Sequence, residues 1–291
     1  MKKGIYAILI LGVIVLIACL ILIKHDVQVV SNIEIDMPYM SGAVSNLPWL
    51  NNDQFLKAQK KTDAYTLMAA YCTVFESSSL NEEHNVQLAA SSLSGVIIEP
   101  NEVFSQNNTI GPYDEEKGYK AGQSYIGSKI TTTIGGGVCK LATTLYNVAV
   151  ASNLEIVERY NHFMPVSYVP YGQDATVSYG SKDLKFRNIT DSPILIWAEA
   201  IDNRLFVSFY GQQKAPNVKW NHKISNRIDA PKVYKSNPNL PEGVERTLVK
   251  GMEGALVESW VIISYPEGDV ETKHMGVSQY WPMPHVIESC H

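Results

Sequence analysis

The stretch Gly135-Gly136-Gly137-Val138-Cys139 guides the interpretation of this chain, because three glycines run directly into a cysteine. The residues that follow, 140–152, carry leucine, valine and alanine at helical spacing, so we predict that Cys139 lies in the first turn of a helix. Unpaired backbone N–H groups and the positive end of the helix dipole favour a thiolate there. The pattern indicates a nucleophilic cysteine; the simpler interpretation is a small core residue beneath a glycine turn.

The residues around Cys139 are predicted to contact a ligand. Gly135, Gly136 and Gly137 have no side chain, so they allow a substrate backbone to approach closely and leave backbone amides free for an oxyanion. The positive charge of Lys140 would stabilise a neighbouring thiolate. We therefore expect these four residues to form the binding surface beside the thiol.

His162 and Asp174, further along the chain, complete a candidate catalytic site. His162 follows a predicted strand at 154–159, and Asp174 follows it in turn. A thiol nucleophile needs a base in hydrogen-bond reach and a carboxylate that orients the base, so we predict a Cys139–His162–Asp174 site. The alternatives are a histidine that stabilises a turn and an aspartate that bonds its own backbone in the turn 172–174.

Two further residues are candidates for ligand binding. Arg159 is suited to a carboxylate of a peptide, although it is also adjacent to Glu158 at a strand end. Tyr168 is suited to the wall of a sugar or peptide cleft, and a half-buried strand tyrosine is the commoner role. The sequence has no Cys-x-x-Cys or histidine-rich cluster, so we expect no metal and no other cofactor.

An uncharged apolar run at the start of the chain predicts a membrane anchor. Residues 5–23 match the length that spans a bilayer, and two lysines before them favour a cytoplasmic tip at 1–4. We therefore expect a single-pass protein of the cell membrane with its bulk on the outer face. The alternative is a lipoprotein acylated at Cys19, because Leu16-Ile17-Ala18-Cys19 fits a lipobox.

Composition limits the partners and the redox state. The formal net charge of −5 and the absence of a basic stripe argue against nucleic acid as a partner. Four cysteines are present, and a bond between Cys72 and Cys290 would leave Cys139 as a free thiol. Three free thiols outside the apolar run are equally compatible with the spacing.

The order of predicted elements indicates an α+β fold. We expect one or two helices packed on an antiparallel sheet within residues 66–214, since a helix at 81–94 and the helix after Cys139 are followed by many short strands. Strands are expected at 64–75, 154–159, 166–169, 175–179, 184–186, 194–200 and 205–210. Residues 24–65 are predicted to be a stalk, 215–238 a linker and 239–291 a small all-β module.

Many ordered pieces of the middle of the chain resemble the VanW family, over residues 71–213. The pieces are 85–90 with Gly95, 100–105, 118–119, 135–139, 143–147, 158–159, His162, 168–170, 172–177 and 183–186. Two positions depart from the family pattern, because Lys140 stands where glutamine is usual and Ala142 where serine is usual. The residues from 240 to 284 are similar to G-five modules, for which glycan binding is proposed.

The resemblance implies a cell-envelope protein that binds peptidoglycan or its precursors and is linked to glycopeptide resistance or envelope maintenance. Separately, the order of Cys139, His162 and Asp174 resembles transglutaminase-like and papain-like thiol enzymes, so the enzymatic prediction is a thiol hydrolase or transferase that acts on a peptide or amide bond. A non-catalytic glycan- or peptide-binding scaffold and a membrane assembly partner are the alternatives.

Overall fold

The computed structural model describes residues 37–75, 79–126 and 129–290. The predicted cytoplasmic tip, the apolar run 5–23 with Cys19, and the first part of the stalk lie outside these residues. Within the described part of the chain, no helix is both long and apolar enough to cross a membrane.

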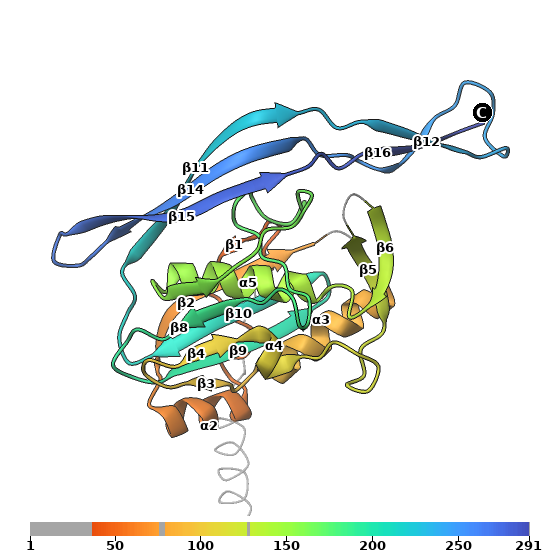
Figure 1. Ribbon diagram of the computed structural model, residues 1–291. Coiled ribbons are helices and arrows are strands. Elements are labelled where there is room, and N and C mark those ends of the chain that lie inside the picture. Colours follow the sequence, from red (N-terminus) through yellow and green to blue (C-terminus); the bar gives the residue numbers. More distant parts are fainter. Residues whose placement is uncertain (1–36, 76–78, 127–128, 291) are drawn as a thin grey trace, which may run out of the picture. The chain divides into compact units, whose positions relative to one another are not determined.

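A five-stranded antiparallel sheet forms the centre of the fold (Figure 1). Its strands, in spatial order, are β1 (Gly42–Ala43), β2 (Thr66–Val74), β10 (Arg204–Gly211), β9 (Ile194–Ile201) and β3 (Ile97–Ile98). The side chains of β9 alternate between two hydrophobic clusters, since successive residues of a strand point to opposite faces. Ile196 and Ala198 belong to one cluster, while Leu195 and Trp197 belong to the other. Both faces of the sheet are therefore covered.

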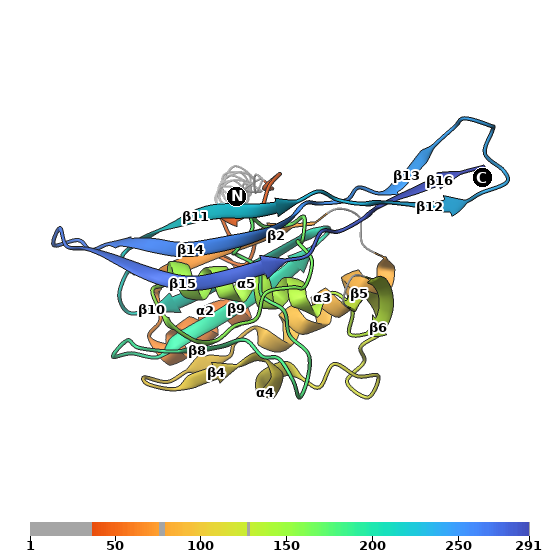
Figure 2. The same cartoon turned by 45° about the horizontal axis from the view of Figure 1, so that its top comes forward.

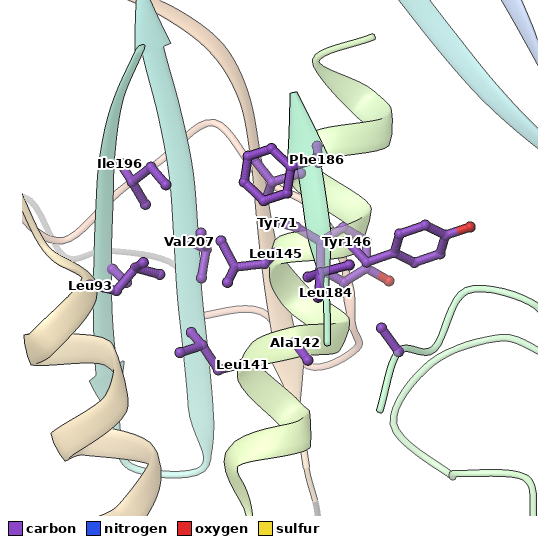
Figure 3. Close-up of a cluster of buried hydrophobic side chains, with 14 of the residues drawn as sticks. Tyr71, Leu93, Leu141, Ala142, Leu145, Tyr146, Leu184, Phe186, Ile196 and Val207 are labelled. Carbon is purple, nitrogen blue, oxygen red and sulfur yellow. The ribbon is translucent and has the colours of Figure 1, made fainter. Parts of the chain in front are cut away.

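Helices cover the two faces. Helices α3 (Leu80–Leu93) and α5 (Val138–Ala151) contact one face, and α2 (Asp53–Thr62) packs Phe55 against Trp197 on the other, with ring centroids 5.2 Å apart. Figure 3 shows Leu141 and Leu145 of α5 beside Val207 of β10. The α+β class is confirmed. The predicted stalk differs in its later part, because β1 and α2 fold onto the sheet through a buried Trp49 and Phe55.

Smaller elements surround the core. Strands β4 (Val103–Ser105), β8 (Lys185–Arg187) and β7 (Glu155–Glu158) form a three-stranded sheet, and β5 (Ala121–Ile126) pairs with β6 (Lys129–Ile134). Helix α4 spans Gln106–Ile110. The segments 166–169 and 175–179 form no extended strand, since Ser178 makes only an isolated bridge with Lys182.

Two three-stranded sheets form the C-terminal module. One consists of β11 (Asn217–Ile228), β14 (Gly254–Ser264) and β15 (Val270–Tyr280), and the other of β12 (Lys232–Ser236), β16 (His285–Ser289) and β13 (Arg246–Val249). Figure 2 shows β14 running between β11 and β15. The expectation of a linker at 215–238 is corrected here, because β11 pairs with β14 along most of its length. The module therefore begins earlier than the sequence suggested.

The first sheet of this module also covers α5. Trp220 of β11 lies against Tyr146 of α5 with ring centroids 5.8 Å apart, and Val261 and Ile263 of β14 join the main hydrophobic cluster. As a result α5 is buried along almost its whole length. The three described cysteines, Cys72, Cys139 and Cys290, are free thiols, so the bond considered between Cys72 and Cys290 is absent.

Candidate active site

A tight glycine turn places Cys139 in the first turn of α5, as predicted. Gly137 is the residue before the helix and has φ of +106°, a conformation that side chains rarely adopt. A Cβ atom on Gly136 would lie 2.2 Å from the backbone of Gly122 in β5. The turn can therefore form only where the chain has no side chains, and Gly135 and Gly136 are buried in it. Their contact with a ligand stays a prediction.

The structure brings Cys139, His162 and Asp174 together. Nδ1 of His162 lies 2.7 Å from Oδ2 of Asp174, and the backbone N–H of His162 donates to the same oxygen at 2.7 Å. With Nδ1 held by the carboxylate, Nε2 is the ring nitrogen that remains, and the imidazole and the thiol of Cys139 shift each other's pKa, lowering that of the thiol and raising that of His162. This is the order thiol, base and orienting acid that a nucleophilic cysteine needs.

A further side chain lies beside the thiol. The hydroxyl of Thr176 is 3.4 Å from Sγ of Cys139, and the carbonyl of Val177 is 3.6 Å from it. Both belong to the loop that follows Asp174, so one segment supplies the acid and the thiol's neighbours. Cys139 as a residue is partly exposed.

Electrostatics favours a thiolate and an imidazolium. Burial raises the pKa of Cys139, but the hydrogen bond and charge of His162, with a hydrogen bond from Thr176, hold it below its ordinary value. Burial lowers the pKa of His162, and Asp174 and Cys139 outweigh this and raise it to about 9. Burial raises the pKa of Asp174, but His162 and Arg159 bring it down to about 2. At neutral pH the imidazole therefore carries a proton, and its charge shifts the equilibrium of Cys139 towards the thiolate.

Arg159 holds the other side of Asp174. Its Nη2 lies 3.0 Å from Oδ1 of Asp174, and its Nε donates to the backbone carbonyl of the same residue at 2.7 Å. Nη1 donates to Ser278 of β15 at 2.7 Å, and the guanidinium lies 5.1 Å from the ring centre of Tyr146. All three nitrogens of Arg159 thus have partners inside the protein, which gives it a structural role in addition to the predicted binding of a ligand.

The remaining predicted binding residues lie elsewhere. The ammonium of Lys140 forms a buried ion pair with Glu82 of α3 and lies 4.5 Å from the ring centre of Phe75. Its charge is therefore paired inside the protein. Tyr168 is partly buried and packs against the main hydrophobic cluster.

Sequence reasoning missed Thr176, which lies beside the thiol, and Ser278 and Tyr280 of β15, which bond Arg159 and Asp174 respectively. The stretch Ser278-Gln279-Tyr280 had a signal, because it supports the resemblance to G-five modules, but nothing in the pattern connects it to residues more than one hundred positions earlier. In the described part of the chain, no group of three or more histidine, cysteine, aspartate or glutamate side chains is arranged to hold a metal ion.

Comparisons with known proteins find similar sequences for the middle of the chain. Residues 81–210 match the family model described as VanW like protein. The chain is 37% identical over 143 residues to the protein YoaR of Bacillus subtilis, covering 49% of this chain and 47% of the relative. It is 31% identical over 179 residues to the vancomycin B-type resistance protein VanW of Enterococcus faecalis, covering 57% of this chain and 64% of the relative. The matched stretches thus span about half to two thirds of these relatives.

Two solved structures align with about a quarter of the chain. A G5 domain of IgA1 protease is 25% identical with a TM-score of 0.17, covering 27% of this chain and 95% of that one. The G5 domain of HP0197 is 13% identical with a TM-score of 0.15, covering 25% and 97%. The match over residues 81–210 places the glycine turn, the thiol, the histidine and the aspartate inside one region that is similar to the VanW family.

Proposed function

We propose that this protein is a thiol hydrolase or transferase of the cell envelope, and that it acts on a peptide or amide bond of peptidoglycan or its precursors. One observation carries the proposal. Nδ1 of His162 lies 2.7 Å from Oδ2 of Asp174, and the imidazole in turn lowers the pKa of Cys139, whose Sγ also lies 3.4 Å from the hydroxyl of Thr176. A structural cysteine in a core has no need of such a partner.

The chemistry follows from the positions of the groups. The thiolate of Cys139 attacks the carbonyl carbon, and the carbonyl π electrons move to the oxygen. When this intermediate collapses, the C–N bond breaks, and the imidazolium of His162 gives its proton to the leaving amine. A thioester remains on Cys139. Water, or an acceptor amine in a transferase, then gives a proton to His162 and attacks the thioester, and the thiolate leaves.

The first turn of α5 supports the oxyanion in this scheme. The N–H groups of Val138 and Lys140 donate to the carbonyls of Gly135 and Gly137 at 3.2 and 2.9 Å. We assign the oxyanion to the N–H of Cys139, which stands beside the thiol at the positive end of the helix dipole. Asp174 stays charged throughout and orients the imidazole.

The substrate class and the location rest on relatives and on the sequence. The Enterococcus faecalis relative is named a vancomycin B-type resistance protein, which favours a role in resistance to glycopeptides or in envelope maintenance. The uncharged run at 5–23 favours an anchor that leaves the domain on the outer face of the membrane. Peptide stems and their cross-links would then be the amide bonds within reach.

Alkylation by iodoacetamide tests the activated thiol. We expect Cys139 to react well below the ordinary thiol pKa of about 8.5, as followed by mass spectrometry of its peptide over a range of pH. Cys290 is also partly exposed and serves as the comparison in the same sample. A Cys139 profile with an ordinary midpoint would remove the enzyme proposal and favour the scaffold.

Turnover is tested on muropeptides. The chain with Cys139→Ser should lose release or exchange of amide-linked stem residues while still binding the muropeptide. Equal turnover by this variant would overturn the proposal. Binding by both proteins without any turnover would identify the scaffold instead.

A further inference from the structure

The last residues of strand β15, in the C-terminal module, reach the carboxylate of the candidate triad. The hydroxyl of Tyr280 donates to Oδ1 of Asp174 and accepts from the backbone N–H of Gly172 at 2.9 Å. Burial and the charge of Asp174 raise the pKa of Tyr280, so the phenol keeps the proton that it donates. Tyr280 is 2% exposed, so this contact lies inside the protein.

The same strand fixes Arg159. Ser278 accepts from Nη1 of Arg159 at 2.7 Å, while Nη2 of that guanidinium lies 3.0 Å from Oδ1 of Asp174. Oδ1 is thus held by Tyr280 and Arg159, and Oδ2 is left to the two N–H groups of His162. Because each oxygen of Asp174 has its own donors, the rotation of the carboxylate group is fixed.

Two further hydrogen bonds join the end of β15 to the segment around His162. The N–H of Trp281 donates to the carbonyl of Phe163 at 2.8 Å, and Nδ2 of Asn161 donates to the carbonyl of Gln279 at 2.9 Å. Two residues before Asp174, a Cβ atom on Gly172 would lie 2.2 Å from Oγ of Ser259 in β14. The loop that carries Asp174 is therefore packed directly against the C-terminal module.

We propose that the C-terminal module is part of the thiol site, and that Tyr280 is a positioning residue that fixes Asp174 so that His162 faces Cys139. The inference rests on the proposed function, because it assigns a partner to the same triad. Without the hydroxyl of Tyr280, Oδ1 loses one of its two donors and the carboxylate gains freedom to rotate. The imidazolium is then less firmly oriented, and it stabilises the thiolate less.

The test is the pH profile of Cys139 alkylation in the full chain with Tyr280→Phe. We expect the rate at about pH 6 to fall about three- to tenfold, the size expected for loss of one hydrogen bond, with little change at alkaline pH. Loss of stability alone would lower the melting temperature without moving the midpoint of this profile. Tyr171→Phe is the matched control, since the Tyr171 hydroxyl donates to the carbonyl of Glu253 at 2.6 Å and its ring packs against Tyr280.

Further variants decide the outcome. Tyr280→Phe should add no shift in a chain that already carries Asp174→Asn, because the residue acts through Asp174. If Tyr280→Phe does not fold, Ser278→Ala, which removes the acceptor of Arg159 Nη1 and a hydrogen-bond partner of Tyr280, is judged by the same profile. An activated thiol with identical profiles in the unaltered and variant chains overturns this inference alone. A thiol of ordinary pKa in the unaltered chain overturns the proposed function and this inference together.

Discussion

His162 donates twice to one oxygen of Asp174, from its backbone N–H and from Nδ1, each at 2.7 Å. The backbone bond fixes the position of the residue, and the ring bond fixes the rotation of the imidazole. A carboxylate that only capped a turn would need the first bond and not the second. The pair of bonds therefore separates an orienting role for Asp174 from the turn interpretation that its sequence context also allows.

Replacement of this carboxylate should weaken the thiolate. In Asp174→Asn the charge that raises the pKa of His162 is lost, so we expect Cys139 alkylation at about pH 6 to fall about tenfold or more. Asp183→Asn is the matched control, because Asp183 is a buried carboxylate that binds Ser105 and Asn107 instead. Equal profiles for Asp174→Asn and the unaltered chain would refute the orienting role.

The stability contributed by His162 should depend on pH in a defined direction. Its pKa is raised from 6.5 to about 9 in the folded protein, so its contribution is complete below 6.5 and is lost as the pH rises through about 9. The difference in free energy of unfolding between the unaltered chain and His162→Gln should therefore shrink over that interval. Urea unfolding at a series of pH values measures it, and a difference that grows with pH would contradict the assignment.

The contribution of Asp174 to stability should depend on pH in the acid range. Its pKa is lowered from 3.8 to about 2, so its contribution to stability is present above 3.8 and is lost as the pH falls toward 2. Acid unfolding of the unaltered chain should show this loss, and Asp174→Asn should lack it. An identical acid dependence in both chains would show that the carboxylate is not paired in the folded protein.

The glycine turn should not tolerate a methyl group. In Gly136→Ala the added carbon collides with the backbone of Gly122, so we expect a loss of stability of about 1–3 kcal/mol or failure to fold. Gly42→Ala is the control, since nothing lies within 4 Å of a Cβ atom there and its φ is not positive. Thermal or urea unfolding compares the two, and equal stability would mean that the turn has room that the structure does not give it.

Lys140 should matter for stability rather than for the thiol. Lys140→Met leaves Glu82 buried without its partner, and such a change costs about 3–5 kcal/mol. Adding Glu82→Gln should recover part of this loss, while the alkylation profile of folded Cys139 stays unchanged. A profile that moves with Lys140 would restore the role of this lysine in thiolate stabilisation.

Regular elements could be predicted from the sequence, whereas the site depended on contacts between distant segments. The helix that contains Cys139 has apolar residues at helical spacing and begins directly after three glycines, so it was predictable. Strand β14 was predictable as well, because it alternates between buried and half-buried residues. All residues of β11 and β12 are exposed or only half-buried, so neither strand has a buried apolar face, and both resemble a linker. Their pairing with β14 and β16 is a property of the fold rather than of the local sequence.

The loop around the site was the hardest part to predict. The apolar residues at 166–169 and 175–179 resemble strands, but Val166 and Val169 pack into the main hydrophobic cluster, and the backbone of Ala175 and Thr176 bonds to α5 and to a neighbouring segment. Thr143 of α5 bonds both the N–H and the carbonyl of Ala175 at 3.0 Å, and the N–H of Thr176 donates to the carbonyl of Tyr160 at 2.8 Å. These bonds replace a strand ladder, and they place Thr176 beside the thiol.

The burial of α5 from both sides has a practical consequence for dissecting this chain. Tyr146 lies under Trp220, so a fragment ending near residue 214 would expose to water an apolar face that the intact chain covers. Such a fragment would precipitate or bind unrelated surfaces, and its inactivity would be mistaken for evidence about chemistry. Single-atom substitutions in the intact chain are the sounder way to separate the role of residues up to about 214 from that of the C-terminal module.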